Sequence, residues 1–332
     1  METALLLLPD MQSLGLGLKS VFGVSGAAEL TILDRERNVY ASGSLSEIVT
    51  CRFADGRVLR LLFKYARYPD ATRNCDLTDE HFIVQSWSNV PYEAAVYRHA
   101  LEPLRLSTPK FYGTYLEPGS GRVWLVLEYF DNAIPLDELF DGSHMDTASN
   151  WLGRFHAVGE HLVANASVFF LKRLDAGHYS ALVKRSRSHA GKLDHWFPWL
   201  PDLCARFEDF VASMWTRRPT LTHGDYYRHN ILLRDGNIHP VDWEQAAIDL
   251  GEMDLACLTH RWPAKITQCC ELEYQRSRWP QGPPGDFKTV LSAARLMLYL
   301  DEIRNLPNWT DHNERLIFGQ EMRSWGECLG LM

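Results

Sequence analysis

The sequence lacks the patterns that mark a disulfide framework or a zinc site. It contains seven cysteines, an odd number, and none of them forms a C-x-x-C pair. Its thirteen histidines form no H-E-x-x-H motif or comparable ligand spacing. Cysteines without such spacing are typical of reduced thiols in a cytosolic protein. We therefore expect a cytoplasmic protein with neither structural disulfides nor zinc.

Long apolar runs are also missing. The only continuous leucine run, residues 5–8, is preceded by an acidic residue and stopped by Pro9. It is too short, and its flank has the wrong charge, for a signal peptide. No window approaches the roughly 20 apolar residues that a membrane helix needs. The sequence therefore predicts a protein without a membrane partner.

The sequence also lacks an excess of basic residues. The net charge of -8 and a pI near 5.9 argue against a nucleic-acid partner, because such proteins usually carry a basic patch. An acidic surface favours a cationic small molecule such as an aminosugar, although most proteins of this charge bind none. With 332 residues, 46% of them hydrophobic, the chain is long enough for two lobes with separate cores. We expect a monomer or a homodimer.

What the sequence does contain is a loop, a hairpin and a second loop within residues 222–255. A His-Gly-Asp tripeptide ends at Asp225, and Asn230 follows after four residues. Two short apolar runs then flank an Asp-Gly turn, and the second run ends at Asp242. The paired strands of a hairpin hold the loops at their open ends close together. We therefore expect Asp225, Asn230 and Asp242 to converge.

These three side chains suit metal-assisted phosphoryl transfer. Such a reaction needs a carboxylate that accepts the proton of the attacking hydroxyl and oxygen ligands for Mg²⁺. Asp225 fits the first role. Asn230 and Asp242 fit the second, because Mg²⁺ prefers one or two carboxylates plus substrate phosphates to an all-protein cage. The alternative is a turn-rich hairpin with ordinary surface carboxylates, but the agreement of several parts in order favours the functional interpretation.

The spacing resembles the protein-kinase catalytic loop, in which an Asp is followed after four residues by an Asn and later by a metal-binding Asp. Here Gly224 stands where protein kinases have Arg, and Trp-Glu follows Asp242 where they have Phe-Gly. Together with Gly251 and Asp254, the segment is similar instead to the aminoglycoside phosphotransferase and choline kinase family. The resemblance spans about residues 30–305. It implies a bilobal, protein-kinase-like α+β fold with a small antiparallel-sheet N-lobe and a larger, mostly helical C-lobe.

The N-terminal part predicts a short helix within residues 1–28 and then several strands. A Gly-x-Gly at residues 15–17 lacks a third glycine and indicates packing or a turn. Lys64 follows an apolar run in a strand that should be buried, which is unusual for an ammonium without a partner. The resemblance supplies Glu93 as that partner, in a pair that holds the phosphates of the nucleotide. Alternatively, Lys64 snorkels outward and Glu93 only favours its helix N-terminus.

Two further segments are predicted to contact the nucleotide because of their expected positions in the fold. The turn that carries Ser44 and Ser46 lies where kinase-like folds have the loop that covers the phosphates, although an ordinary hairpin explains it equally well. The segment with Glu128 and Phe130 resembles the hinge, whose backbone groups bind the adenine edge. We place the lobe boundary after it, with an N-lobe at residues 1–130 and a C-lobe at 131–332. The long polar connection at residues 66–90 is interpreted as an insertion that either contacts the substrate or forms an interface, and the sequence does not decide between the two.

The C-lobe is predicted to be helical, with Trp151, Phe155 and Val158 on one helix face and His156 as a structural histidine beside them. In the resembled family the acceptor site is built largely from the final helical region. Aromatic and acidic side chains there would suit an amphipathic cationic acceptor, although the tryptophans fit a core as well. These side chains are Trp262, Trp279, Trp309, Trp325, Asp301, Glu302, Asp311 and Glu314.

The resemblance implies a small-molecule kinase that transfers the γ-phosphate of ATP, with Mg²⁺, to a hydroxyl of a small metabolite or antibiotic. His223 would stabilise the catalytic loop, Asp254 would anchor its backbone, and Glu244 is a possible extra contact to metal or substrate. A choline, ethanolamine or homoserine kinase and a nucleotide-binding pseudoenzyme remain as alternatives. The choice between ATP and GTP stays open.

Overall fold

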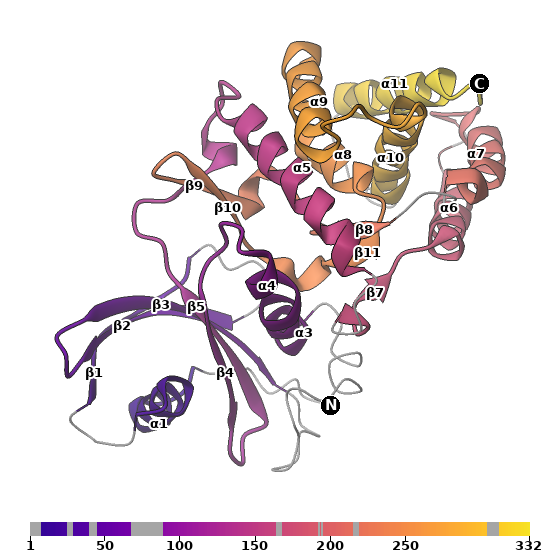
Figure 1. Cartoon of the computed structure of the whole chain (residues 1–332). Helices are drawn as coiled ribbons and strands as arrows, with labels where there is room; N and C mark the ends of the chain where they lie inside the picture. Colours follow the sequence, from indigo (N-terminus) through magenta and orange to yellow (C-terminus); the bar gives the residue numbers. More distant parts are fainter. Residues whose placement is uncertain are drawn as a thin grey trace. The chain divides into compact units, whose positions relative to one another are not determined.

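The computed structural model describes residues 8–24, 29–39, 45–67, 89–163, 168–191, 193, 195–214, 219–303 and 312–332. The chain forms two compact units that interleave along the sequence (Figure 1). Unit 1 comprises Met1–Glu138, Ala166–Leu171 and Asn230–Ala246, and unit 2 comprises Leu139–Asn165, Lys172–His229 and Ala247–Met332. The predicted domains, 1–130 and 131–332, stay a prediction.

Unit 1 is built on a five-stranded antiparallel sheet with the order β1-β2-β3-β5-β4. The strands are β1 (Leu30–Arg37), β2 (Leu45–Phe53), β3 (Val58–Arg67), β4 (Phe111–Glu117) and β5 (Arg122–Glu128). Asp55 and Gly56 lie in the turn that joins β2 to β3, and Gly56 has a φ of 85° there. Glycine adopts this left-handed conformation without a steric penalty.

The two faces of this sheet follow from the alternation of side chains along β3. Phe63 and Tyr65 point into a core that includes Leu14 and Leu18 of α1 (Met11–Phe22) and Trp124 of β5. Because successive side chains of a strand point to opposite faces, Lys64 projects from the other face. On that face it contacts Glu93 of α3 (Val90–Ala95).

Helix α3 begins with local signals that the sequence contains. The Asn89 side chain accepts a hydrogen bond from the Val90 N–H, and Pro91 occupies the first turn. The helix continues through η1 (Val96–Leu101) and α4 (Glu102–Leu104). Unit 1 also holds a small sheet with the order β10-β9-β6, formed by β6 (Ile134–Pro135), β9 (Ile231–Arg234) and β10 (Asn237–Pro240). The β9–β10 pair is the hairpin predicted after Asn230.

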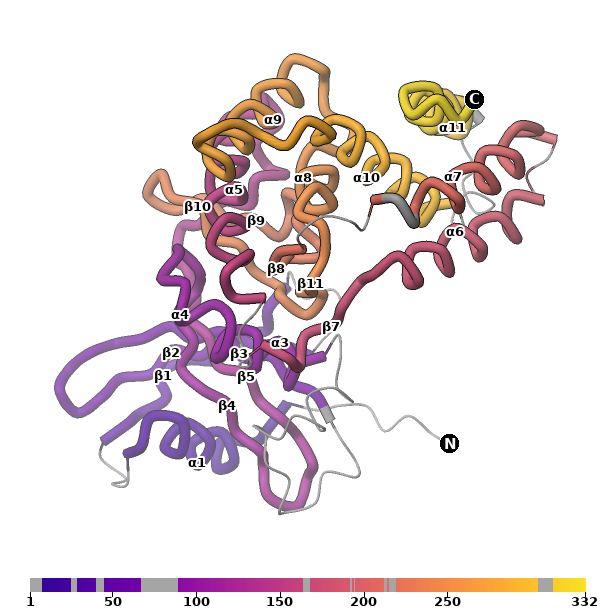
Figure 2. Tube along the Cα trace, turned by 45° about the vertical axis from the view of Figure 1, so that its right-hand side comes forward, coloured from indigo at the N-terminus to yellow at the C-terminus, as the bar shows by residue number. Residues whose placement is uncertain are grey.

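Unit 2 is mostly helical, as predicted for the C-terminal part. Helices α6 (Ala176–Ala190) and α7 (Leu200–Met214) lie side by side in Figure 2, and their apolar faces share a core with α10 (Phe287–Glu302) and α11 (His312–Cys328). Helix α5 (Met145–Leu162) packs on α9 (Ala264–Arg278). A small sheet of β7 (Lys172–Arg173), β11 (Ala247–Asp249) and β8 (Thr220–Thr222) leads into the segment that carries Asp225, and α8 (Glu252–Thr259) follows β11.

Candidate active site

Lys64, Glu93 and Asp242 form a buried ion cluster in unit 1. Lys64 Nζ lies 2.8 Å from both carboxylate oxygens of Glu93 and 2.7 Å from Oδ1 of Asp242. The side chain of Glu93 is 1% exposed and that of Lys64 is 13% exposed. The backbone N–H of Trp243 also donates to Glu93, at 3.2 Å. The structure therefore brings the predicted Lys64–Glu93 pair together, and Lys64 does not snorkel outward.

Burial and charge act in opposite directions on this cluster. Burial disfavours the ammonium of Lys64, but the carboxylates of Glu93 and Asp242 outweigh that effect and raise the pKa of Lys64. Burial raises the pKa of Glu93 to about 7, against the opposing effect of Lys64. Lys64 therefore keeps its positive charge at neutral pH, as a side chain that binds phosphate must.

Asn230 and Asp242 flank the β9–β10 hairpin. The backbone N–H of Val241 donates to the carbonyl of Asn230 at 2.9 Å and so holds the two ends of the hairpin together. Asp242 has a φ of 67°, a left-handed conformation that costs a non-glycine residue free energy and is frequent at functional sites. Its side chain is 33% exposed, so its oxygens are accessible.

The donor set of these two residues fits Mg²⁺ better than a softer metal. One carboxylate and one amide oxygen are hard ligands, and Mg²⁺ is usually held by one or two protein oxygens together with substrate phosphates. Within the described ranges, no group of three or more His, Cys, Asp or Glu side chains could hold a metal ion on its own. The residues present are thus compatible with a metal that arrives with a nucleotide.

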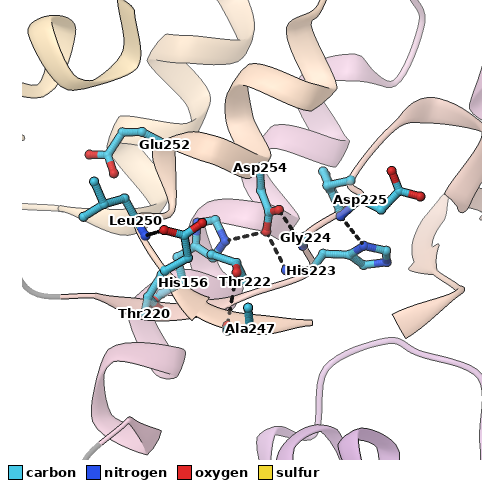
Figure 3. A network of polar contacts seen from close by, with 12 residues as sticks. His156, Thr220, Thr222, His223, Gly224, Asp225, Ala247, Leu250, Glu252 and Asp254 are labelled. Atoms are coloured by element: carbon cyan, nitrogen blue, oxygen red, sulfur yellow. Dashed lines mark hydrogen bonds and ion pairs between the residues drawn. The ribbon is translucent and has the colours of Figure 1, made fainter. Parts of the chain in front are cut away.

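The loop that carries Asp225 belongs to unit 2 and is fixed through its backbone. Asp254 accepts hydrogen bonds from the N–H groups of His223, at 2.7 Å, and Gly224, at 2.9 Å (Figure 3). Gly224 has a φ of 79°, which explains glycine at the position where protein kinases have Arg. In Figure 3 the carboxylate of Asp225 points away from Asp254. The loop is therefore held by its main chain while its side-chain carboxylate is presented outward.

A buried chain of hydrogen bonds supports Asp254 from behind. His156 Nε2 lies 3.1 Å from Asp254, His156 Nδ1 lies 2.8 Å from the Tyr274 hydroxyl, and Arg278 donates to that hydroxyl at 2.5 Å. Arg278 also pairs with Glu160 at 2.8 Å. Burial lowers the pKa of His156, which favours the neutral ring. A neutral ring protonated on Nε2 satisfies every bond of the chain, since Nδ1 then accepts from Tyr274.

The sequence predicts His156 as a structural histidine and gives Tyr274 and Arg278 no role in the site. His156 and Tyr274 are 118 residues apart in the chain, so no local pattern links them. The structure places His156 in contact with Asp254, which holds the backbone of the loop that carries Asp225, and Tyr274 in contact with His156.

The segment predicted as a hinge lies at the end of β5. The N–H groups of Glu128 and Tyr129 donate to the carbonyls of Lys110 and Arg60. The N–H of Phe130 makes no hydrogen bond to any residue within the described ranges, so it remains available to a ligand. The guanidinium of Arg234 lies 4.8 Å above the Phe130 ring and also contacts Glu128.

Of the two serines predicted to contact phosphates, only Ser46 is described. It lies directly opposite Lys64 in the β2–β3 ladder, is 3% exposed, and its hydroxyl accepts a hydrogen bond from Asn38. Ser44 lies outside the described residues, as do Trp309, Asp311 and most of the 66–90 connection. The roles of Ser44 and Ser46 stay predictions.

An antiparallel five-stranded sheet combined with many helices is the architecture of protein-kinase-like phosphotransferases, and comparison with solved structures confirms this predicted fold class. The sequence profile of the phosphotransferase enzyme family matches residues 78–279, more than half of the chain. The chain belongs to this family, as the resemblance of its motifs predicted. A search of curated proteins found no match.

Three of the similar structures illustrate the range of the fold. The macrolide 2'-phosphotransferase MphH from Brachybacterium faecium is 17% identical over 94% of this chain and 98% of its own, with a TM-score of 0.54. The choline kinase LicA from Streptococcus pneumoniae is 14% identical over 97% and 99%, with a TM-score of 0.53. The amicoumacin kinase hAmiN, in complex with AMP-PNP, Ca²⁺ and Ami, is 12% identical over 96% and 94%, with a TM-score of 0.57. At these identities the similarity shows the fold alone.

Across the described ranges, every helix is too short or too polar to cross a bilayer.

Proposed function

We propose that this protein transfers the γ-phosphate of ATP to a hydroxyl group of a small molecule. The observation that carries the proposal is the buried cluster of Lys64, Glu93 and Asp242, with Asn230 beside Val241 at the open end of the same hairpin. Two carboxylates hold one ammonium in place, next to oxygen ligands of the kind that Mg²⁺ prefers. An ordinary structural ion pair would need no second carboxylate with a left-handed backbone and an accessible oxygen.

Each residue has one role in the proposed reaction. Lys64, held by Glu93, binds the phosphates. Asn230 and Asp242 would hold Mg²⁺, which would offset negative charge on the phosphates. The backbone of Phe130 binds the adenine edge. Asp225 orients the acceptor hydroxyl and accepts its proton. A bond forms between the hydroxyl oxygen and the γ-phosphorus, the bond from that phosphorus to the β,γ-bridging oxygen breaks, and ADP leaves.

The relatives support this chemistry without identifying the acceptor. The family is one of phosphotransferases, and the similar hAmiN structure contains a nucleotide analogue and a divalent cation. A macrolide phosphotransferase and a choline kinase match equally well, so antibiotic modification and metabolic phosphorylation are both served by the fold. A nucleotide-binding pseudoenzyme is the alternative from another class.

The first prediction concerns Asp225. A coupled ADP-release screen over aminoglycosides, macrolides, amino alcohols, nucleosides, sugars and hydroxy acids, with mass spectrometry of the products, identifies an acceptor. With that acceptor, Asp225→Asn should lower kcat by about 10²- to 10⁴-fold, as expected for the loss of a positioned base. ATP binding should persist, because Asp225 contributes none of the proposed nucleotide contacts.

Asp235→Asn is the matched control. Asp235 lies in the turn of the β9–β10 hairpin, its side chain is 86% exposed, and the same carboxylate-to-amide change there should leave kcat within about twofold of wild type. Equal kcat values for Asp225→Asn and wild type would refute the assignment. Tight ATP binding without any phosphorylated product would favour the pseudoenzyme.

A further inference from the structure

A cavity of about 390 Å³ lies among the helices of unit 2. Its walls come from the end of α8 and from α9, α10 and α11, and they include His260, Trp262, Glu271, Arg295 and Trp325. This volume lies within the range of small-molecule sites.

The cavity is connected to the loop that carries Asp225. The ring of Tyr227 meets the ring of His260 edge-on, with the centroids 6.3 Å apart, and His260 lines the cavity. The backbone N–H of Tyr227 donates to the carbonyl of Asp225 at 2.8 Å. A single residue therefore separates the cavity wall from the main chain of Asp225.

The carboxylates and tryptophans that line the cavity, which are groups of the kind that binds a cation, are already engaged by the protein. Glu271 accepts from Arg295 at 2.8 Å, and Glu321 accepts from the Tyr299 hydroxyl at 2.8 Å. The guanidinium of Arg295 also covers the ring of Trp325, with 4.9 Å to the centroid. An entering ammonium would have to compete with the guanidinium of Arg295 for both Glu271 and Trp325.

The same is true of Trp262, the other tryptophan of the cavity wall. The guanidinium of Arg228 lies 4.6 Å from the centroid of the Trp262 ring, and Glu321 lies 3.7 Å from Nε of Arg261. Each cavity tryptophan thus has one face covered by an arginine, and each cavity carboxylate has an arginine partner. The cavity offers no prepared cage for a cation.

The balance of charge in the cavity wall is positive. The permanent cations Arg261, Lys288 and Arg295 face two carboxylates, Glu271 and Glu321, which leaves one positive charge. Lys288, on the first turn of α10, is exposed and forms no ion pair with any residue of the described part of the chain. A ligand with one negative charge would balance the charge of the wall, because an excess of positive charge attracts an anion.

We propose that this cavity receives the acceptor, and that the acceptor carries an anionic group, a carboxylate or a phosphate monoester, which binds next to Lys288. This inference rests on the proposed function, since it names the acceptor class of the same reaction. It departs from the cationic acceptor that the composition suggested.

The test compares matched acceptors and matched variants. The acceptors are hydroxy acids with their neutral amides, sugar phosphates with the parent sugars, and a set of aminoglycosides and amino alcohols. The first two pairs distinguish a carboxylate from a phosphate. The variants are Lys288→Glu and the control Lys265→Glu, which makes the same charge change at an exposed α9 residue outside the cavity wall.

We expect the wild-type protein to phosphorylate an anionic acceptor in preference to its neutral partner. Lys288→Glu should raise the KM for that acceptor by about tenfold or more, as the loss of a charge-assisted contact predicts, with the KM for ATP unchanged. Lys265→Glu should stay within about twofold of wild type. Phosphorylation of cationic acceptors only, or equal KM values for both variants, would overturn the inference and leave the proposed function standing. Failure of every acceptor despite ATP binding would contradict both.

Discussion

At the scale of single residues, the site depends on a few buried polar groups whose partners are far away in sequence. Asp254 accepts hydrogen bonds from two backbone N–H groups of the loop that carries Asp225 and from His156, and Tyr274 and Arg278 hold the His156 ring from behind. A buried polar group that loses its partner costs about 1–3 kcal/mol. These residues are therefore positioning residues, which act on Asp225 only through the loop.

His156 predicts a pH dependence of stability. Burial lowers its pKa in the folded state below the ordinary value of 6.5, so the unfolded chain binds the proton first as the pH falls. The free energy of unfolding should therefore decrease as the pH drops through 6.5, until the folded state also takes up the proton. His156→Gln should remove this component.

The measurement is the free energy of unfolding in denaturant at about pH 7.5 and about pH 5.5, for wild type and His156→Gln. The decrease between the two pH values should be smaller in the variant. His161→Gln, at an exposed position of the same helix, should behave as wild type. An unchanged decrease in His156→Gln would show that the ring does not have the protonation behaviour inferred from its burial.

At the scale of elements, local sequence patterns predicted the structure correctly where a single strand, helix or turn determines it. The Asp-Gly hairpins, the strand with Lys64 and the helix start before Glu93 are all encoded within a few residues. Local patterns gave a wrong prediction where packing against a neighbouring element determines which side chains of a helix are buried. Val158, predicted on the buried face of α5, is 40% exposed, because His156, which contacts Tyr274 of α9, and Gly159, which lies against Thr220 of β8, face inward instead.

Helix α1 offers a matched pair of glycines for a test of packing. A Cβ at Gly17 would overlap the buried ring of Trp124, whereas a Cβ at Gly15 would meet nothing within 4 Å. Gly17→Ala should therefore destabilise the protein by about 1–3 kcal/mol through overpacking. Gly15→Ala should stabilise it by about 0.5–1 kcal/mol, because alanine loses less backbone entropy in a helix.

Thermal or denaturant unfolding of the two variants checks this prediction. Opposite signs of the change in unfolding free energy are expected. Changes of the same sign would mean that α1 does not pack on Trp124 as described, and that the Gly-x-Gly at residues 15–17 has another role.

At the scale of the whole molecule, the chain crosses between its two units several times. Asn230–Ala246 belongs to unit 1 although the residues on both sides of it belong to unit 2. Sequence spacing identified the set of Lys64, Glu93, Asn230 and Asp242 because the resemblance supplied the long-range pairing. Sequence spacing did not predict the hydrogen bonds of Tyr274 and Arg278 or the charges of the proposed acceptor cavity. Both depend on contacts between helices that are distant in the sequence.

The central claim is that Asp242, with Lys64 and Asn230, forms a site for a metal-bound nucleotide. Calorimetric titration of ATP with and without Mg²⁺ tests it most directly, because no acceptor is needed. For wild type and Asp235→Asn, Mg²⁺ should tighten ATP binding. Asp242→Asn should lose most of that gain, because an amide replaces the carboxylate ligand. A gain from Mg²⁺ that is the same in all three proteins, or absent from wild type, would contradict the account.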